Sequence, residues 1–275
     1  IKNIIWNIRY SNFELGKAKL ATIIIIKILS KLSYLIPQFI IINSKRAKKI
    51  FEKSYDKKKL KFISNGIDLS ILKPNKIEKI NFKKKIKVKK QIPLIGNVAT
   101  YDPKKDHLNL IKALSLIRSK NIDFFCTLVG TNINQNNIEL TSEIKRLGLT
   151  AYVKLLGQND DIRQVMNGLD IYVQSSSYGE GFPNVVAEAM ACGTPCVVTD
   201  VGDAGFIVGK NGWVVQPKDP TKLANAIKKA ISGIESNYWS KRRDKARSRI
   251  KENFNITKMI KCYNNLWIKV LEKDK

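Results

Sequence analysis

Short apolar runs alternate with stretches of helical periodicity from about residue 92 onward. The runs at 92–98, 124–129, 153–156, 169–173 and 195–198 have the length of buried strands. Between two of them, Leu110, Ile111, Leu114 and Ile117 recur at helical spacing. Strands that alternate with helices predict a parallel, doubly wound α/β domain.

The ends of these elements carry local signals. Gly130 and Gly157 directly follow two of the strands, where the chain must turn tightly at the carboxyl edge of the sheet. Ligands bind at that edge in doubly wound sheets. After the last strand, apolar positions 223, 227, 230, 231 and 234 share one helix face, and Asp219 and Pro220 supply an N-cap and a first-turn proline.

The charge of the chain is large and uneven. Its 275 residues hold 50 Lys and Arg against 23 Asp and Glu, a formal charge of +27, and 44% hydrophobic residues exclude a disordered basic tail. The first ninety residues carry 24 basic and 5 acidic side chains. This field suggests anionic partners, although a compositional bias toward lysine explains it equally well. The composition changes near Lys90, after the lysine-rich stretch 75–90, which looks like a linker or a solvated face and marks a domain boundary.

Other features limit the chemistry and the compartment. A single histidine, His107, excludes a multi-histidine zinc site and argues against a Ser-His-Asp triad. Four cysteines without a CxxC pair predict buried thiols in a reducing compartment, so we expect a cytoplasmic protein. The apolar stretch 20–42 is interrupted by Lys27, Lys31 and Pro37, so any membrane contact is expected to be peripheral. No signal-peptide pattern follows Ile1, which indicates a processed start or a piece of a longer chain.

One segment, SYGEGFPNVVAEAMACGTPCVVTDVG, carries most of the functional information. Asn184 is the expected N-cap of a short helix over 185–191, Gly193 stops it, and a strand begins near residue 195. The first amides of such a helix can hold a phosphate without a basic side chain. Glu180 lies before the helix and Glu188 one turn inside it, where carboxylates can accept hydrogen bonds from sugar hydroxyls.

With its companion motifs, this segment resembles the retaining GT-B glycosyltransferases of family 4. The resemblance covers about residues 40–215, and it rests on these motifs in their order along the chain: NGIDL, VATYDPKKDHLNLIKAL, TLVG, KLLGQNDDI, DIYVQSS, and the pair Glu180 and Glu188 with EGFPNV and EAMACGTPCV. It implies an α/β fold with a complete C-terminal Rossmann-like donor domain. Only the C-terminal part of an N-terminal Rossmann-like domain would precede it.

The resemblance also assigns residues to roles. Glu180 and Lys105 would be catalytic: Glu180 contacts the hexose of a nucleotide sugar, and Lys105 is the cation on its diphosphate. The alternative is that Lys105 is a surface lysine at the helix start like its neighbour Lys104, since the assignment depends on the register. Glu188 would bind the ribose. Main-chain groups would complete the donor site at Gly181, Phe182, Pro183, Asn184 and Val185, and at the base-binding loop Leu156, Gly157 and Gln158. His107 is expected to have a structural role.

Two departures from the family pattern stand out. An arginine that usually precedes the lysine by five or six residues is replaced by Thr100, which removes a charge from the diphosphate site. The glycine-rich loop of the N-terminal domain is missing, and strands at 4–8, at 39–43 and before Asn65 would be what remains of that domain. Arg9 is either an acceptor-site cation or an exposed residue at a strand end.

These observations predict three parts. Residues 1–88 would be the remnant of an acceptor-binding domain and a linker, 89–252 the donor-binding domain, and 253–275 a C-terminal crossover helix. The apolar stripe of that helix would pack on the first domain, with packing on its own domain as the alternative; the stripe consists of Ile256, Met259, Ile260, Tyr263, Leu266, Trp267, Val270 and Leu271.

The expected function is transfer of a hexose from a UDP- or GDP-sugar to a hydroxyl of a sugar or lipid-linked acceptor, with retention and without an essential metal or other cofactor. It would serve cell-surface polysaccharide or glycolipid synthesis at the inner face of an anionic membrane. Two alternatives remain: a catalytically degraded homologue that acts as a binding partner, and a basic nucleic-acid-binding protein. The latter is disfavoured because the lysines are not interleaved with aromatic residues. A nucleotide-sugar epimerase on the same fold is a related enzyme possibility.

Overall fold

The structure is a computed structural model of the chain, and it describes residues 3–9 and 20–272. The first domain holds a parallel sheet in the order β1-β2-β3, formed by β1 (Ile5–Ile8), β2 (Phe39–Ile42) and β3 (Leu60–Phe62). Helices α1 (Leu20–Leu32) and α2 (Lys45–Phe51) accompany it. The three strands expected in this part are therefore confirmed.

The second domain is built on a six-stranded parallel sheet in the order β6-β5-β4-β7-β8-β9. Its strands are β4 (Leu94–Val98), β5 (Phe125–Val129), β6 (Val153–Leu155), β7 (Ile171–Gln174), β8 (Cys196–Thr199) and β9 (Trp213–Val215). All five strands expected from the apolar runs are present, and the doubly wound α/β topology is confirmed. The strand order changes direction between β4 and β7, which is where such sheets bind ligands.

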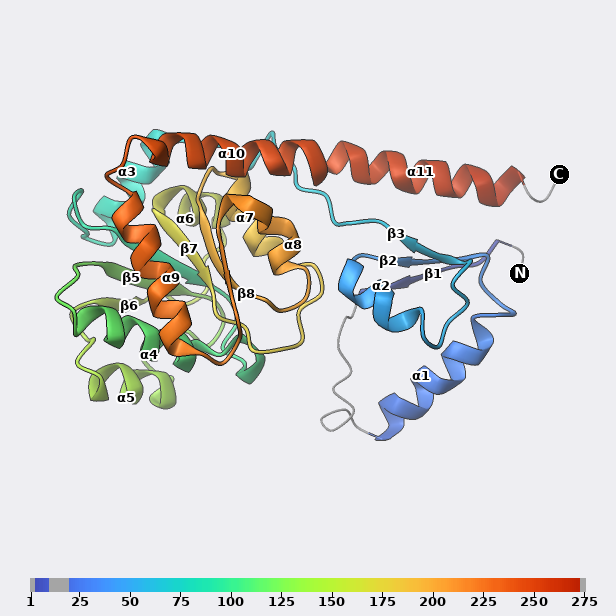
Figure 1. Cartoon of the computed structure of the whole chain (residues 1–275), viewed down its shortest axis with the longest axis horizontal. Coiled ribbons are helices and arrows are strands. Elements are labelled where there is room, and N and C mark those ends of the chain that lie inside the picture. Colours follow the sequence, from blue (N-terminus) through green and yellow to red (C-terminus); the bar gives the residue numbers. More distant parts are fainter. Residues whose placement is uncertain (1–2, 10–19, 273–275) are drawn as a thin grey trace.

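Helices cover both faces of this sheet (Figure 1). On one face lie α3 (Lys76–Lys85), α6 (Ile162–Gly168), α7 (Asn184–Ala191), α8 (Ala204–Val208) and α10 (Tyr238–Asn253). The other face carries α4 (His107–Arg118), α5 (Ile138–Arg146) and α9 (Pro220–Gly233). Asp219 caps α9 by accepting from the main-chain N–H of Lys222, and Pro220 is its first residue, as the sequence predicts.

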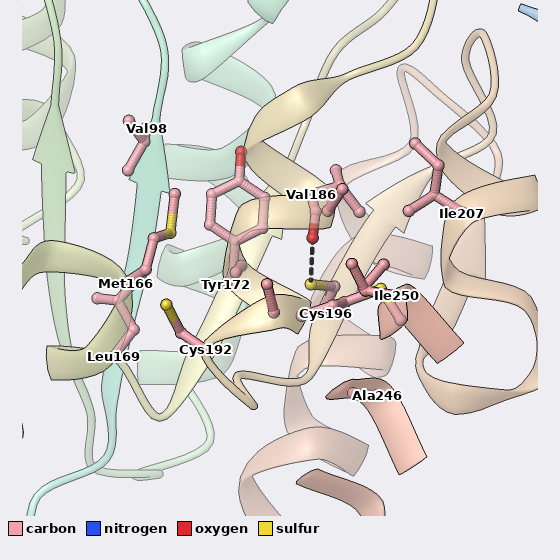
Figure 2. Packing of buried hydrophobic residues seen from close by; sticks show 14 of the residues in the cluster. Val98, Met166, Leu169, Tyr172, Val186, Cys192, Cys196, Ile207, Ala246 and Ile250 are labelled. Carbon is pink, nitrogen blue, oxygen red and sulfur yellow. Dashed lines mark hydrogen bonds between the residues drawn. The ribbon is translucent and has the colours of Figure 1, made fainter. Parts of the chain in front are cut away.

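Close packing fixes α7 against the sheet. Figure 2 shows Tyr172 of β7, Val186 of α7 and Cys196 of β8 in one buried cluster, with Ile250 of α10 beside them. The Sγ atom of Cys196 lies 3.7 Å from the main-chain oxygen of Val186, to which it donates a weak hydrogen bond. Closely packed apolar side chains therefore fix α7 at the carboxyl edge of the sheet.

The lysine-rich stretch 75–90 is not a linker, nor is it only a solvated face. It forms helix α3, whose Phe82 is fully buried in the core of the second domain. The ring packs where a Cβ on Gly168 of α6 would come within 2.1 Å of it. Lys83, also on α3, is only 7% exposed. The expectation failed because most residues of the stretch are charged, while three of its side chains, Phe82, Lys83 and Ile86, are buried.

The C-terminal helix α11 (Ile256–Glu272) crosses from the second domain to the first, as Figure 1 shows along the upper edge of the molecule. Its Leu266 and Val270 pack with Phe39, Ile41 and Ile63 of the first domain. The expected packing of the apolar stripe is confirmed for these two residues and for the partly buried Met259 and Tyr263. It is wrong for three exposed residues of the stripe, Ile260, Trp267 and Leu271.

Two further sequence expectations can be compared with the structure. Cys126, Cys192 and Cys196 are buried thiols, but Cys262 is exposed on α11, so the expectation of four buried cysteines is wrong for Cys262. Within residues 3–9 and 20–272, none of the helices has the length and apolar character needed to cross a membrane.

Candidate functional site

The candidate site forms where β4 and β7 lie side by side and end at the same edge of the sheet. The segment after β4 contains Thr100 and a short 3-10 turn (Pro103–Lys105) that ends in Lys105. The segment after β7 contains Glu180 and leads into helix α7. The strand order thus brings together residues that are 75 positions apart in the chain.

Lys105 and Glu180 form the centre of this site. The Nζ atom of Lys105 lies 2.5 Å from Oε1 of Glu180, and the hydroxyl of Ser176 donates to the same oxygen at 2.7 Å. Glu180 is only 8% exposed. Ser176 was not predicted as a site residue; the serine run that directly follows β7 was the available signal.

The structure distinguishes Lys105 from its neighbour. Lys104 pairs with Asp102 at 3.5 Å, whereas Lys105 reaches Glu180. Hydrogen bonds brace the two loops around them: the Ser175 hydroxyl donates to the main-chain oxygen of Lys105 at 2.8 Å, and the Ser177 main-chain N–H donates to that of Lys104 at 2.8 Å. Lys105, and not Lys104, therefore contacts Glu180, and its role on a diphosphate stays a prediction.

Helix α7 begins at Asn184, and the expected N-cap is wrong. Pro183 occupies the cap position with no side-chain cap hydrogen bond, and Asn184 is already the first helical residue. The side-chain oxygen of Asn184 instead accepts from the Asn65 side chain at 2.8 Å, a contact with the first domain that local sequence could not reveal. The first main-chain N–H groups of a helix have no partner within the helix, and they carry its positive dipole end.

The side chains before α7 serve packing. Phe182 and Pro183 are buried, and the Phe182 ring lies 5.4 Å from that of Phe254. Gly181 has no side chain, and Val185 is partly buried against the same core. Main-chain groups are therefore what residues 181–185 can offer to a ligand, together with the Asn184 amide.

Glu188 lies one turn inside α7 and is partly buried. Burial raises the pKa of its carboxyl group above the ordinary value.

The loop Leu156–Gln158 lies beside the loop that follows β5. The Gly157 N–H donates to Ile133 at 2.7 Å, and the Gly157 carbonyl accepts from Gly130 at 2.8 Å. The Leu156 N–H donates to Leu128 at 3.0 Å. Gly157 is therefore fixed by the neighbouring loop, and base recognition at this loop would fall to the Leu156 carbonyl and to Gln158.

The remaining residues singled out by the sequence are Thr100, Arg9 and His107. Thr100 is exposed just beyond β4. Arg9 is exposed directly after β1, at the carboxyl edge of the first sheet. His107 is buried at the start of α4 with both ring nitrogens unpaired, 5.4 Å from the Tyr101 ring. Burial, followed by the charge of Lys105, lowers the pKa of His107 to about 4, so the ring is neutral at physiological pH.

Metal ligands do not gather in this part of the fold. No group of three or more His, Cys, Asp or Glu side chains that could hold a metal ion occurs within residues 3–9 and 20–272. The metal-independent reaction expected from the sequence stays a prediction.

A ligand edge at the switch point of one doubly wound domain, linked to a second parallel sheet by a crossing C-terminal helix, defines the GT-B class of α/β proteins. Solved glycosyltransferases share this fold. A glycosyltransferase from Rickettsia africae aligns with a TM-score of 0.85 and 21% identity over 97% of this chain and 70% of that chain. HepE from Anabaena in complex with UDP aligns with a TM-score of 0.85 and 24% identity over 96% of this chain and 72% of that chain.

The chain belongs to the glycosyl transferases group 1 family, whose sequence model matches residues 78–253. A putative glycosyltransferase EpsF of Bacillus subtilis is 30% identical over 54% of this chain and 38% of its own length. The UDP-Gal:alpha-D-GlcNAc-diphosphoundecaprenol alpha-1,3-galactosyltransferase of Escherichia coli is 27% identical over 78% of this chain and 55% of its own length. The chain thus spans about half the length, or less, of these relatives.

Proposed function

We propose that this chain carries the donor site of a retaining family 4 hexosyltransferase, which moves a hexose from a UDP- or GDP-sugar to an acceptor hydroxyl without an essential metal. The observation that carries the proposal is the Lys105–Glu180 pair, 2.5 Å apart beside the start of α7. A cation, a carboxylate and the start of a helix at one edge match a diphosphate joined to a sugar.

The donor would replace the internal ion pair. As the bond between the anomeric carbon and the diphosphate oxygen breaks, the electron pair leaves with the diphosphate, the acceptor oxygen bonds to the anomeric carbon, and the acceptor proton passes to the departing diphosphate. The Lys105 ammonium and the first amides of α7 would stabilise that growing negative charge. The Glu180 carboxylate would accept from hexose hydroxyls, and Glu188, one turn further on, from the ribose hydroxyls. Each group therefore has a partner on a different part of the donor.

The relatives support this substrate class. HepE was solved with UDP and with UDP-glucose. The galactosyltransferase from Escherichia coli is named for a UDP-sugar donor and a diphosphoundecaprenol-linked acceptor. We therefore place the reaction in the synthesis of a cell-surface polysaccharide or glycolipid, on a lipid-linked or sugar acceptor.

The first domain suits a cytoplasmic, peripheral membrane location. Helix α1 exposes Ile24, Ile25 and Ile28 alongside Lys27 and Lys31. Apolar side chains beside lysines favour an anionic lipid surface. Flotation with vesicles that contain anionic lipid tests this part: wild type should float with them, and Ile25→Glu should reduce the bound fraction. Equal binding to neutral vesicles would contradict a role for the charge.

Calorimetric titration with UDP, UDP-glucose and GDP-mannose, each with and without EDTA, tests the donor site. We expect saturable binding of one nucleotide series that persists in EDTA. Lys105→Ala and Glu188→Ala should each weaken it roughly tenfold, given the usual contribution of hydrogen bonds to charged groups. Lys104→Ala is the matched control and should bind as wild type.

Two outcomes would reject the proposal. Absence of binding by any sugar nucleotide would exclude the enzyme, and binding that is insensitive to Glu188 would exclude this site. NMR of the sugar that slow donor hydrolysis releases reports the anomeric configuration, and an inverted product would contradict retention.

A further inference from the structure

A buried carboxylate joins the two domains next to residues 180–183, which we call the donor loop. Asp203 is 1% exposed. Its side chain accepts from the Ser44 hydroxyl at 2.9 Å, from the Lys45 main-chain N–H at 2.6 Å and from the Arg46 main-chain N–H at 3.0 Å. All three donors belong to the start of α2 in the first domain, about 158 positions away in sequence. The Asp203 carboxylate, which belongs to the second domain, therefore accepts these hydrogen bonds from the first domain.

The main chain of the same residue holds the donor loop. The Asp203 N–H donates to the carbonyl of Gly181 at 2.8 Å. The preceding residue, Gly202, has a φ of +58°, and a Cβ there would lie 2.4 Å from the Glu180 carbonyl oxygen. The turn at 202–203 thus rests on residues 180–181 with no room for a side chain between them.

A row of aromatic rings forms a second link across the same seam. The Phe182 ring of the donor loop lies 5.4 Å from Phe254, which lies 5.5 Å from Phe206, and Phe206 lies 6.3 Å from Phe62 of the first domain. The Lys45 ammonium sits 4.0 Å above the Phe206 ring. Packed rings transmit displacement because closely packed interiors resist deformation. Residues 180–182 are therefore held against the first domain by hydrogen bonds and by packing.

We propose that Asp203 is a positioning residue that couples the seating of α2 to the placement of donor loop 180–183. When Ser44, Lys45 and Arg46 hold the carboxylate, the 202–203 turn fixes the Gly181 carbonyl and with it the backbone that carries Glu180. When that contact is lost, the loop relaxes and Glu180 no longer meets the hexose in a fixed geometry. The first domain thereby controls affinity for the sugar part of the donor without touching it.

Hydrogen exchange of the ligand-free protein tests the coupling alone. Ser44→Ala removes one donor from the far side of the seam, and Asp203→Asn places an amide opposite main-chain N–H groups. Both variants should exchange faster than wild type at the residue 203 N–H, which donates to the Gly181 carbonyl of the donor loop, while strands β4 and β5 keep their protection. Asp200→Asn is the matched control, since Asp200 lies on the same segment and its side chain lies 3.6 Å from the exposed guanidinium of Arg46. Unchanged exchange of the residue 203 N–H in both variants would overturn the proposal.

Affinity measurements then test the consequence for the donor, and this arm rests on the proposed function. Both variants should bind UDP-glucose roughly tenfold more weakly, the loss of about one hydrogen bond to a charged group, while UDP affinity stays within about twofold of wild type. An equal loss for both ligands would indicate general destabilisation and reject the positioning role. If wild type binds neither ligand, the proposed function fails, and the exchange result still decides the coupling.

Discussion

The Lys83 ammonium donates to Oδ2 of Asp170 at 2.7 Å, although Lys83 belongs to the most lysine-rich stretch of the chain. Lys79 meets the other oxygen at 2.5 Å, and the Leu94 main-chain N–H donates to Oδ2 at 2.8 Å. The carboxylate therefore fastens α3 to the start of β4. Burial acts to raise the pKa of Asp170, but the two lysines outweigh it and hold that pKa below the ordinary value.

Replacing this carboxylate should be costly. Asp170→Asn leaves the Lys83 ammonium buried without a counter-charge, so we expect the free energy of unfolding to fall by about 3–5 kcal/mol. Because the folded-state pKa of Asp170 is depressed, its contribution is present above the unfolded-state pKa and is lost as pH falls through the folded-state value. Urea denaturation at neutral and acid pH measures both effects. The control Asp160→Asn, at an exposed position, should leave the free energy of unfolding at both pH values as in wild type. A loss below about 1 kcal/mol in Asp170→Asn would contradict the role of the pair.

Donor affinity should depend on the protonation of Glu188. Since burial raises the pKa of Glu188, its carboxyl group protonates at a higher pH than an ordinary glutamate and loses acceptor capacity. Affinity for the nucleotide should therefore fall as pH is lowered from neutral into the weakly acidic range. Calorimetric titration over that range measures the decline, which should be absent in Glu188→Gln. The same decline in Glu188→Gln would assign it to another group.

The missing arginine can be restored. Thr100 is exposed at the end of β4, close to the segment that carries Lys105. Thr100→Arg should add a charge-assisted hydrogen bond to the diphosphate and raise UDP affinity roughly tenfold. Thr100→Gln, which is long but neutral, is the control and should raise it less. Unchanged affinity in Thr100→Arg would mean that another group already supplies this charge.

The single histidine should be dispensable for catalysis. Both ring nitrogens of buried His107 lack partners, so His107→Phe removes unsatisfied polar atoms and should leave stability at neutral pH unchanged or improved. Since the pKa of His107 is lowered from 6.5 to about 4, the unfolded chain binds a proton in that interval and the folded chain does not. Wild type should lose stability as pH falls from about 6.5 to about 4. Thermal melts should show a smaller loss in His107→Phe, and loss of donor binding with an intact fold would contradict its structural role.

The sequence predicts what depends on local periodicity. The strand runs and the helix over residues 223–234 are found where the pattern places them, and the register that selected Lys105 over Lys104 agrees with the ion pairs. The sequence does not predict contacts whose partner lies far away in the chain. Asn184 looks like an N-cap, but its amide oxygen is taken by Asn65, 119 positions away.

The same reason explains the other errors. The charge of Lys79 and Lys83 predicts exposure to solvent. Their partner Asp170 lies 91 and 87 positions further along the chain, so local sequence patterns do not reveal it. The Asp203 carboxylate was not singled out, since its partners at 44–46 lie in another domain. Ion pairs and hydrogen bonds between distant segments leave no periodic trace in a single sequence.

Because α11 crosses to the first domain, the core of that domain can be completed only after α11 has been synthesised. Leu266 and Val270, near the very end of the chain, fill the core between Phe39, Ile41 and Ile63 near its beginning. The sheet β1-β2-β3 therefore lacks part of its core until α11 has been synthesised, whereas the second domain, which lies between them in the chain, can form its core earlier. Until then the apolar face around Phe39, Ile41 and Ile63 stays uncovered, and a truncation before Leu266 would damage a domain that was synthesised earlier than the deleted residues.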